Sequence, residues 1–231
     1  MRPTCDGAGV RRRADVDGGP PLTGRAVRPP LDCTTRAHRA ERPRRRTVPG
    51  SGLRAWGVAD SGVAEAVAEC RAANLTGWEL VDYATRLVSA QFSTYSVLHP
   101  WASPEAAFRD RRGFCTQYNG ALAVILRELG LDARLVYAAR VRFEDRRDWP
   151  LGHTWVRVRL DGEIRDVCAR SMDNQSGRVH FVPICPVRKL DRITRFLTTA
   201  GSFGTASAAI TRSRLSGRPR PTWVEHPRPQ R

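Results

Sequence analysis

The 231-residue chain lacks any run of eighteen or more apolar residues, which excludes an ordinary transmembrane helix. Its basic N-terminus is not followed by an apolar stretch, so no secretory signal peptide is expected either. We therefore predict a cytoplasmic protein without a membrane partner.

The chain also lacks a closely spaced cysteine pair, although it has six cysteines. In a cytosolic chain such cysteines are expected to be reduced thiols and not a disulfide framework. Cys168, His180 and Cys185 form the one grouping with some resemblance to zinc ligands, but it has neither the short paired spacing nor a clear fourth ligand. We predict no metal site and no cofactor.

Lysine is nearly absent: the chain has one lysine, Lys189, and 38 arginines. The net charge of +16 lies mainly at the two ends: residues 1–55 hold thirteen basic and five acidic residues (+8), and residues 212–231 hold six and one (+5). The stretch between them is only +3. A skew toward arginine, with abundant alanine, glycine and proline, is typical of GC-rich coding sequence. Despite the basic ends, a nucleic-acid partner is therefore not expected.

Three regions differ in composition. Residues 1–55 are rich in arginine, proline and glycine without helical or strand periodicity, so we predict a disordered tail. Residues 56–200 have the patterns of one globular domain, and residues 201–231 are predicted to be a mostly disordered C-terminal tail. The oligomeric state is not indicated by the sequence.

Apolar periodicity predicts helices in the first part of this domain. The spacing of apolar residues favours a helix over 77–93, and Ser103 followed by Pro104 begins a short one. Leu122, Ile125 and Leu129 continue an apolar stripe that starts at residue 118, so a third helix is expected to begin near Cys115 and to stop at residue 130. A final helix is expected around 190–197.

Strand patterns follow these helices. We predict strands over 133–142, 153–160 and 164–168, with Asp161-Gly162 as the hairpin turn and a further edge strand at 182–184. Helices followed by an antiparallel sheet define an α+β fold.

Cys115 and His153 are the candidate catalytic residues. Free N–H groups and the dipole at a helix start stabilise a thiolate, and a nearby histidine can accept the thiol proton and later protonate a leaving amine. His153 stands at the start of a predicted strand, 38 residues after Cys115. A third group is expected to hold the imidazole in one tautomer.

Three ordered segments resemble the transglutaminase-like superfamily. They are RGFCTQY at 112–118, LRELGLDAR at 126–134 and HTWV at 153–156, within a resemblance that spans about residues 60–170. The resemblance implies a papain-like core with N-terminal helices packed on an antiparallel sheet. It also implies that Cys115 is the nucleophile and His153 the general base. Small bacterial members of such a family resemble peptidases or amidases, so a peptide or small amide is the implied substrate.

The third position departs from the family pattern. The family places an aspartate fifteen residues beyond the histidine, where this chain has Cys168. Asp166 lies two residues earlier on the same strand face, about 7 Å away, so we assign Asp166 as the orienting residue. The alternative is that Cys168 holds this position and that the site is weakened or non-catalytic.

Other assignments are less specific. Trp155 and Gln117 are candidate substrate-binding residues, and Trp155 is equally suited to core packing; Asn119 is expected on the helix surface. Residues 111–119 also partly echo the arylamine N-acetyltransferase motif. We therefore keep two alternatives: an acyltransferase of that kind, and a non-catalytic binding module.

Overall fold

The computed structural model describes residues 62–146 and 149–228. The predicted disordered tail 1–55 lies outside the described residues, as do the first residues of the predicted domain. None of the helices in the described part of the chain is long and apolar enough to cross a membrane.

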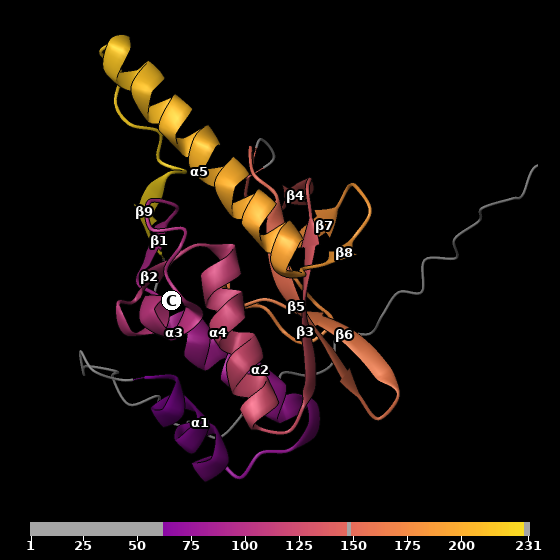
Figure 1. Ribbon diagram of the computed structural model, residues 1–231. Coiled ribbons are helices and arrows are strands. Elements are labelled where there is room, and N and C mark those ends of the chain that lie inside the picture. The colour runs from indigo at the N-terminus through magenta and orange to yellow at the C-terminus, as the bar shows by residue number, and fades with distance from the viewer. Residues whose placement is uncertain (1–61, 147–148, 229–231) are drawn as a thin grey trace, which may run out of the picture. The chain divides into compact units, whose positions relative to one another are not determined.

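The fold is α+β, as the sequence predicted: among the residues described, four helices precede the strands of the main antiparallel sheet, and a fifth helix follows them (Figure 1). The helices are α1 (Val63–Ala72), α2 (Gly77–Gln91), α3 (Pro104–Arg109), α4 (Cys115–Glu128) and α5 (Arg192–Leu215). The strands are β1 (Thr94–Ser96), β2 (Arg112–Gly113), β3 (Asp132–Ala138), β4 (Val141–Phe143), β5 (His153–Leu160), β6 (Glu163–Val167), β7 (Phe181–Pro183), β8 (Arg188–Lys189) and β9 (Glu225–Pro227).

Helix α4 is the centre of the helical layer. It packs against α1, α2 and α3 on one side and against β3 and β5 on the other. Eleven of its fourteen residues are buried, which explains why apolar and small residues dominate it. The core therefore lies between α4 and the sheet.

The main sheet has the strand order β6-β5-β3-β8 and is antiparallel throughout. Asp161 and Gly162 both have positive φ, as a two-residue turn between β5 and β6 requires, so the predicted hairpin is confirmed. A second sheet, β2-β1-β9, joins the end of the chain to its first strand, and β4 pairs with β7.

The C-terminal region differs from the predicted disordered tail. Helix α5 runs to Leu215, and its N-cap Asp191 accepts a hydrogen bond from the Thr194 N–H at 2.7 Å. Strand β9 pairs with β1, and the preceding Val224 is completely buried. The proline- and arginine-rich composition concealed this strand, because a three-residue partner for an existing edge needs no periodicity of its own.

Candidate active site

Cys115 is the first residue of α4, where the sequence predicted it. The preceding Phe114 caps the helix with extended backbone, and its N–H donates to the Gln117 side chain at 3.1 Å. This is the backward half of a capping box, with glutamine three residues after the cap. The Cys115 sulfur therefore lies at the positive end of a fourteen-residue helix dipole.

His153 is the first residue of β5 and pairs with Ala138 of β3. The starts of α4 and β5 are in direct contact, because the hydroxyls of Thr116 and Thr154 lie 3.3 Å apart. Cys115 and His153 both line one cavity of about 200 Å³, which also contains aromatic and arginine side chains. The structure thus brings the two candidate catalytic residues to the same cavity.

Cys168, and not Asp166, contacts His153. The Cys168 sulfur lies 3.3 Å from Nε2 of His153. The Asp166 carboxylate instead accepts two hydrogen bonds from Arg157, at 2.8 and 3.1 Å. In the tautomer with its proton on Nε2, His153 donates to the sulfur and keeps the lone pair on Nδ1.

The register of the β5–β6 hairpin explains this difference from the predicted role of Asp166. Asp166 lies opposite Arg157, four residues from His153 and so about 13 Å along the strand. The chain leaves β6 after Val167, and the next residue turns its sulfur to the imidazole. The family position is therefore filled by Cys168.

The environment of Cys168 is rich in donors. Nδ2 of Asn119 lies 3.5 Å from its sulfur, and the backbone N–H of Arg170 also lowers its pKa, although burial raises that pKa overall. Asn119 is itself fully buried: it donates to the Thr154 carbonyl at 2.7 Å and accepts from the Ala169 N–H at 2.9 Å. It thereby fixes Thr154 and Ala169, the neighbours of His153 and Cys168.

The sequence predicted that Asn119 lies on the helix surface, but the structure buries it completely. Its position in the sequence does carry a signal, since it is four residues after Cys115 and so on the same face of the helix. What the sequence could not provide was the identity of its partners on two later strands.

Burial keeps the two candidate catalytic groups neutral. It raises the pKa of Cys115 to about 11, while backbone and side-chain hydrogen bonds with Thr154 and Thr116 oppose the shift. It lowers the pKa of His153 to about 3, and the positive charge of Arg170 acts in the same direction. Near neutral pH the pair is therefore a thiol and an uncharged imidazole.

Trp155 and Gln117 lie in the interior and do not line this cavity. Trp155 stacks on the His153 ring with centroids 6.1 Å apart and packs on Phe181. The Gln117 amide donates to the carbonyls of His99 and Ala102 at 2.7 and 3.2 Å. Both lie beneath the cavity wall, so their positions do not support the predicted contact with a substrate.

The cavity walls include residues that the sequence did not single out. Tyr95 and Trp149 pack edge to face with ring centroids 5.5 Å apart, and Arg170 lies over Phe143. Arg228, one residue beyond β9, also lines the cavity. These residues come from four separate segments, so no local pattern could identify them.

Asp166→Asn is expected to leave the reactivity of Cys115 unchanged within about twofold. The carboxylate faces Arg157 and not the imidazole, and both side chains are partly exposed, so the loss of stability is expected to stay below about 1 kcal/mol. The measurement is the rate of Cys115 alkylation by iodoacetamide in the variant and the wild type, beside a urea unfolding curve. A fall of tenfold or more in a folded variant would restore Asp166 as the orienting residue.

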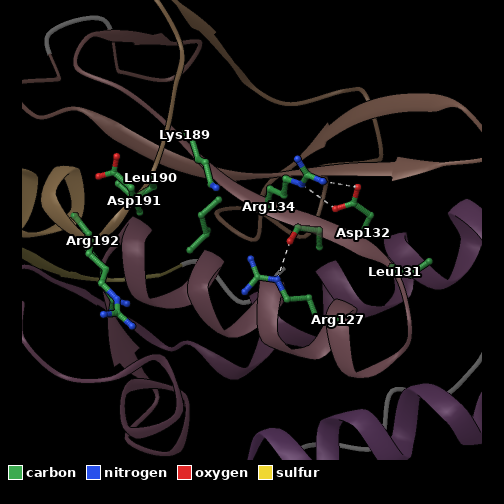
Figure 2. Close-up of a pocket in the computed structure, with 11 residues that line it drawn as sticks. Arg127, Leu131, Asp132, Arg134, Lys189, Leu190, Asp191 and Arg192 are labelled. Atoms are coloured by element: carbon green, nitrogen blue, oxygen red, sulfur yellow. Dashed lines mark hydrogen bonds and ion pairs between the residues drawn. The ribbon is translucent and has the colours of Figure 1, made fainter.

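A larger hollow of about 510 Å³ lies elsewhere, between the end of α4, strands β3 and β8, and the start of α5 (Figure 2). None of the described residues that line it is a cysteine, serine or histidine. Figure 2 shows Arg134 turned to Asp132 and Arg127 turned to a main-chain carbonyl, that of Ala133. Because this hollow is lined by neither a thiol nor an imidazole among the described residues, the smaller cavity at Cys115 is the candidate active site.

A thiol at a helix start, an imidazole at a strand start and an α+β core are the features that the resemblance in the sequence implied. A family model described as the transglutaminase-like superfamily matches residues 61–164. Over these residues the chain therefore contains a transglutaminase-like domain. The resemblance seen in the sequence is confirmed.

Comparison with solved structures gives low overall similarities. A transglutaminase is 16% identical with a TM-score of 0.35, covering 46% of this chain and 30% of its own. A candidate cysteine protease from Cytophaga hutchinsonii is 10% identical with a TM-score of 0.40, covering 56% and 49%. LapG of Legionella pneumophila is 13% identical with a TM-score of 0.33, covering 54% and 81%. The matches span half or less of the first two chains, and no match was found among curated proteins.

Proposed function

We propose that this domain is a cysteine-dependent acyl-transfer enzyme that acts on an amide and passes the acyl group to water. The observation that carries the proposal is the shared cavity of Cys115 and His153, with the thiol at a helix start and the imidazole at a strand start. A transglutaminase-like domain is a natural setting for this pair.

The reaction begins with the neutral pair. As the Cys115 sulfur attacks the amide carbonyl, His153 accepts the thiol proton and the S–C bond forms. The C–N bond then breaks, the imidazolium gives its proton to the departing amine, and a thioester remains on Cys115. Water attacks the thioester with His153 as base, which releases the acid and restores the thiol.

Cys168 makes this a slow variant of the usual arrangement. Its sulfur can accept a hydrogen bond from Nε2 and so fix the tautomer, but a neutral thiol does not stabilise the imidazolium as a carboxylate does. The same observation favours a second candidate function, a binding module in which the pair is retained without turnover.

A simple acyl donor distinguishes the two candidates. With p-nitrophenyl acetate, the wild type is expected to release p-nitrophenolate and to carry an acetyl group on Cys115, detected by peptide mass spectrometry. Cys115→Ala should abolish the labelling, and His153→Ala should slow it by about a hundredfold, the usual contribution of a positioned base.

Cys185→Ala is the matched control, because it removes a more accessible thiol outside the cavity. In this variant, the acetylation of Cys115 should equal that of the wild type. If a folded His153→Ala variant labels Cys115 at the wild-type rate, the enzyme proposal is contradicted and the binding module is supported.

A further inference from the structure

The Cys115 cavity carries an excess of positive charge. Among the described residues that line it are three arginines and a single carboxylate, Asp145. Asp145 is paired with Arg170 at 2.7 Å. His226 stacks on Tyr95, and burial lowers its pKa, so it does not add to the charge near neutral pH.

Arg228 is the most deeply buried of these cations. It is only 8% exposed and makes no ion pair with any described carboxylate. Its Nη2 donates to the carbonyls of Ala169 and Arg170 and to the Ser89 hydroxyl, and its guanidinium lies over the Tyr118 ring. Such a buried cation is costly unless a negative charge accompanies it.

Two side chains of the cavity wall each hold a buried donor that has no partner in the described part of the chain. The donors are Nη1 of Arg228 and Nε1 of Trp149. Buried donors in native proteins are normally paired, so each indicates a missing acceptor. Because both groups are N–H donors, the complementary ligand has to bring hydrogen-bond acceptors, and carboxylate oxygens are strong ones.

We infer that the Cys115 cavity recognises an acyl donor that bears a carboxylate close to the carbonyl under attack, bound by Arg228 and Trp149. This inference rests on the proposed function and names its substrate class. A planar carboxylate suits a guanidinium fork and the space between aromatic rings. The volume of about 200 Å³ is below the usual range for drug-sized ligands, so it fits one short acidic group with the remainder outside.

Two alkylating reagents of the same shape and different charge test the inference. Iodoacetate transfers a carboxymethyl group and iodoacetamide a carbamoylmethyl group to the Cys115 sulfur, each with loss of iodide and the thiol proton. Their rate ratio at Cys115, divided by the ratio for glutathione in the same buffer, reports the charge preference alone. We expect this normalised ratio to favour iodoacetate by about tenfold at low salt, because of the net positive charge near the thiol.

Three variants sharpen the test. Arg228→Gln is expected to lower the normalised ratio several-fold. Asp145→Asn, at a carboxylate with 55% of its side chain exposed, should keep the fold and raise the ratio by freeing Arg170. Arg134→Gln removes an equal charge at a 62% exposed side chain outside the cavity and should leave the ratio unchanged.

The outcomes separate this inference from the proposed function. A normalised ratio near one in the wild type, with Cys115 still alkylated by iodoacetamide, overturns the carboxylate preference alone. The carboxylate preference is also overturned if the ratio does not rise in Asp145→Asn, and this outcome can be read even if Arg228→Gln fails to fold. A Cys115 that reacts with neither reagent until the protein is unfolded overturns both proposals.

Discussion

Cys168→Asp is expected to raise the rate at which iodoacetamide alkylates Cys115 near pH 7 by about tenfold to a hundredfold. The carboxylate would take the place of a sulfur that lies 3.3 Å from Nε2 of His153. A buried carboxylate at that distance stabilises imidazolium, so the pKa of His153 should rise from about 3. Imidazolium in turn stabilises the Cys115 thiolate.

The magnitude follows from two opposing effects on Cys115. Its pKa is now about 11, so almost no thiolate exists near neutral pH, and each unit of decrease gives tenfold more thiolate. The intrinsic nucleophilicity of a thiolate falls as its pKa falls, which cancels about half of the gain on a logarithmic scale. A decrease of about two to four units therefore corresponds to the stated range.

The residues around position 168 can stabilise the added negative charge. Asn119 and the Arg170 N–H already direct hydrogen atoms at the Cys168 sulfur, and Arg170 and Arg228 lower the pKa of that position. Cys168→Asn is the matched control, since it has the shape of aspartate without its charge. The measurement is the alkylation rate of Cys115 between pH 5 and 11, in which the wild type rises continuously toward about pH 11. Equal rates in the two folded variants would contradict a role for the third position.

Ending the chain after Gly217 is expected to destabilise the domain by about 3–5 kcal/mol, or to prevent folding. The deletion removes β9 from the edge of β1, empties the space of fully buried Val224 and takes away the Arg228 guanidinium. The carbonyls of Ala169 and Arg170 would lose their donor next to Cys168. Burial of one valine and several buried hydrogen bonds together account for the magnitude.

Urea unfolding of the full and shortened chains measures this effect. Val224→Ala should give part of the loss, about 1–3 kcal/mol, because it leaves the strand in place. Arg218→Gln, at an exposed position in the same segment, should lie within about 0.5 kcal/mol of the wild type. Unchanged unfolding after deletion would mean that the segment is the loose tail that composition suggested.

The sequence was most informative where a signal is local. The apolar stripe of α4, the cap at Ser103 and the turn at Asp161-Gly162 each depend on residues a few positions apart, and each is present in the structure. The positions of Cys115 and His153 at element starts were predictable for the same reason.

The sequence was least informative where pairing decides the outcome. Asp166 and Cys168 are close in sequence, but the strand register gives one to Arg157 and the other to His153. Asn119 and Arg228 owe their roles to partners 35 and 59 residues away, respectively Thr154 and Ala169. No spacing rule contains that information, because a shift of one residue in register reverses the face of every side chain.

The pairing of β1 with β9 also orders events during synthesis. β1 ends at Ser96, and its partner strand is made about 130 residues later. At typical elongation rates of about 5–20 residues per second, α4 and the β5–β6 hairpin exist for several seconds before Arg228 can reach the carbonyls of Ala169 and Arg170. Cys115 is therefore made well before Arg228, the last residue to join the wall of its cavity, and a nascent chain carries this thiol in a cavity that is still open on one side.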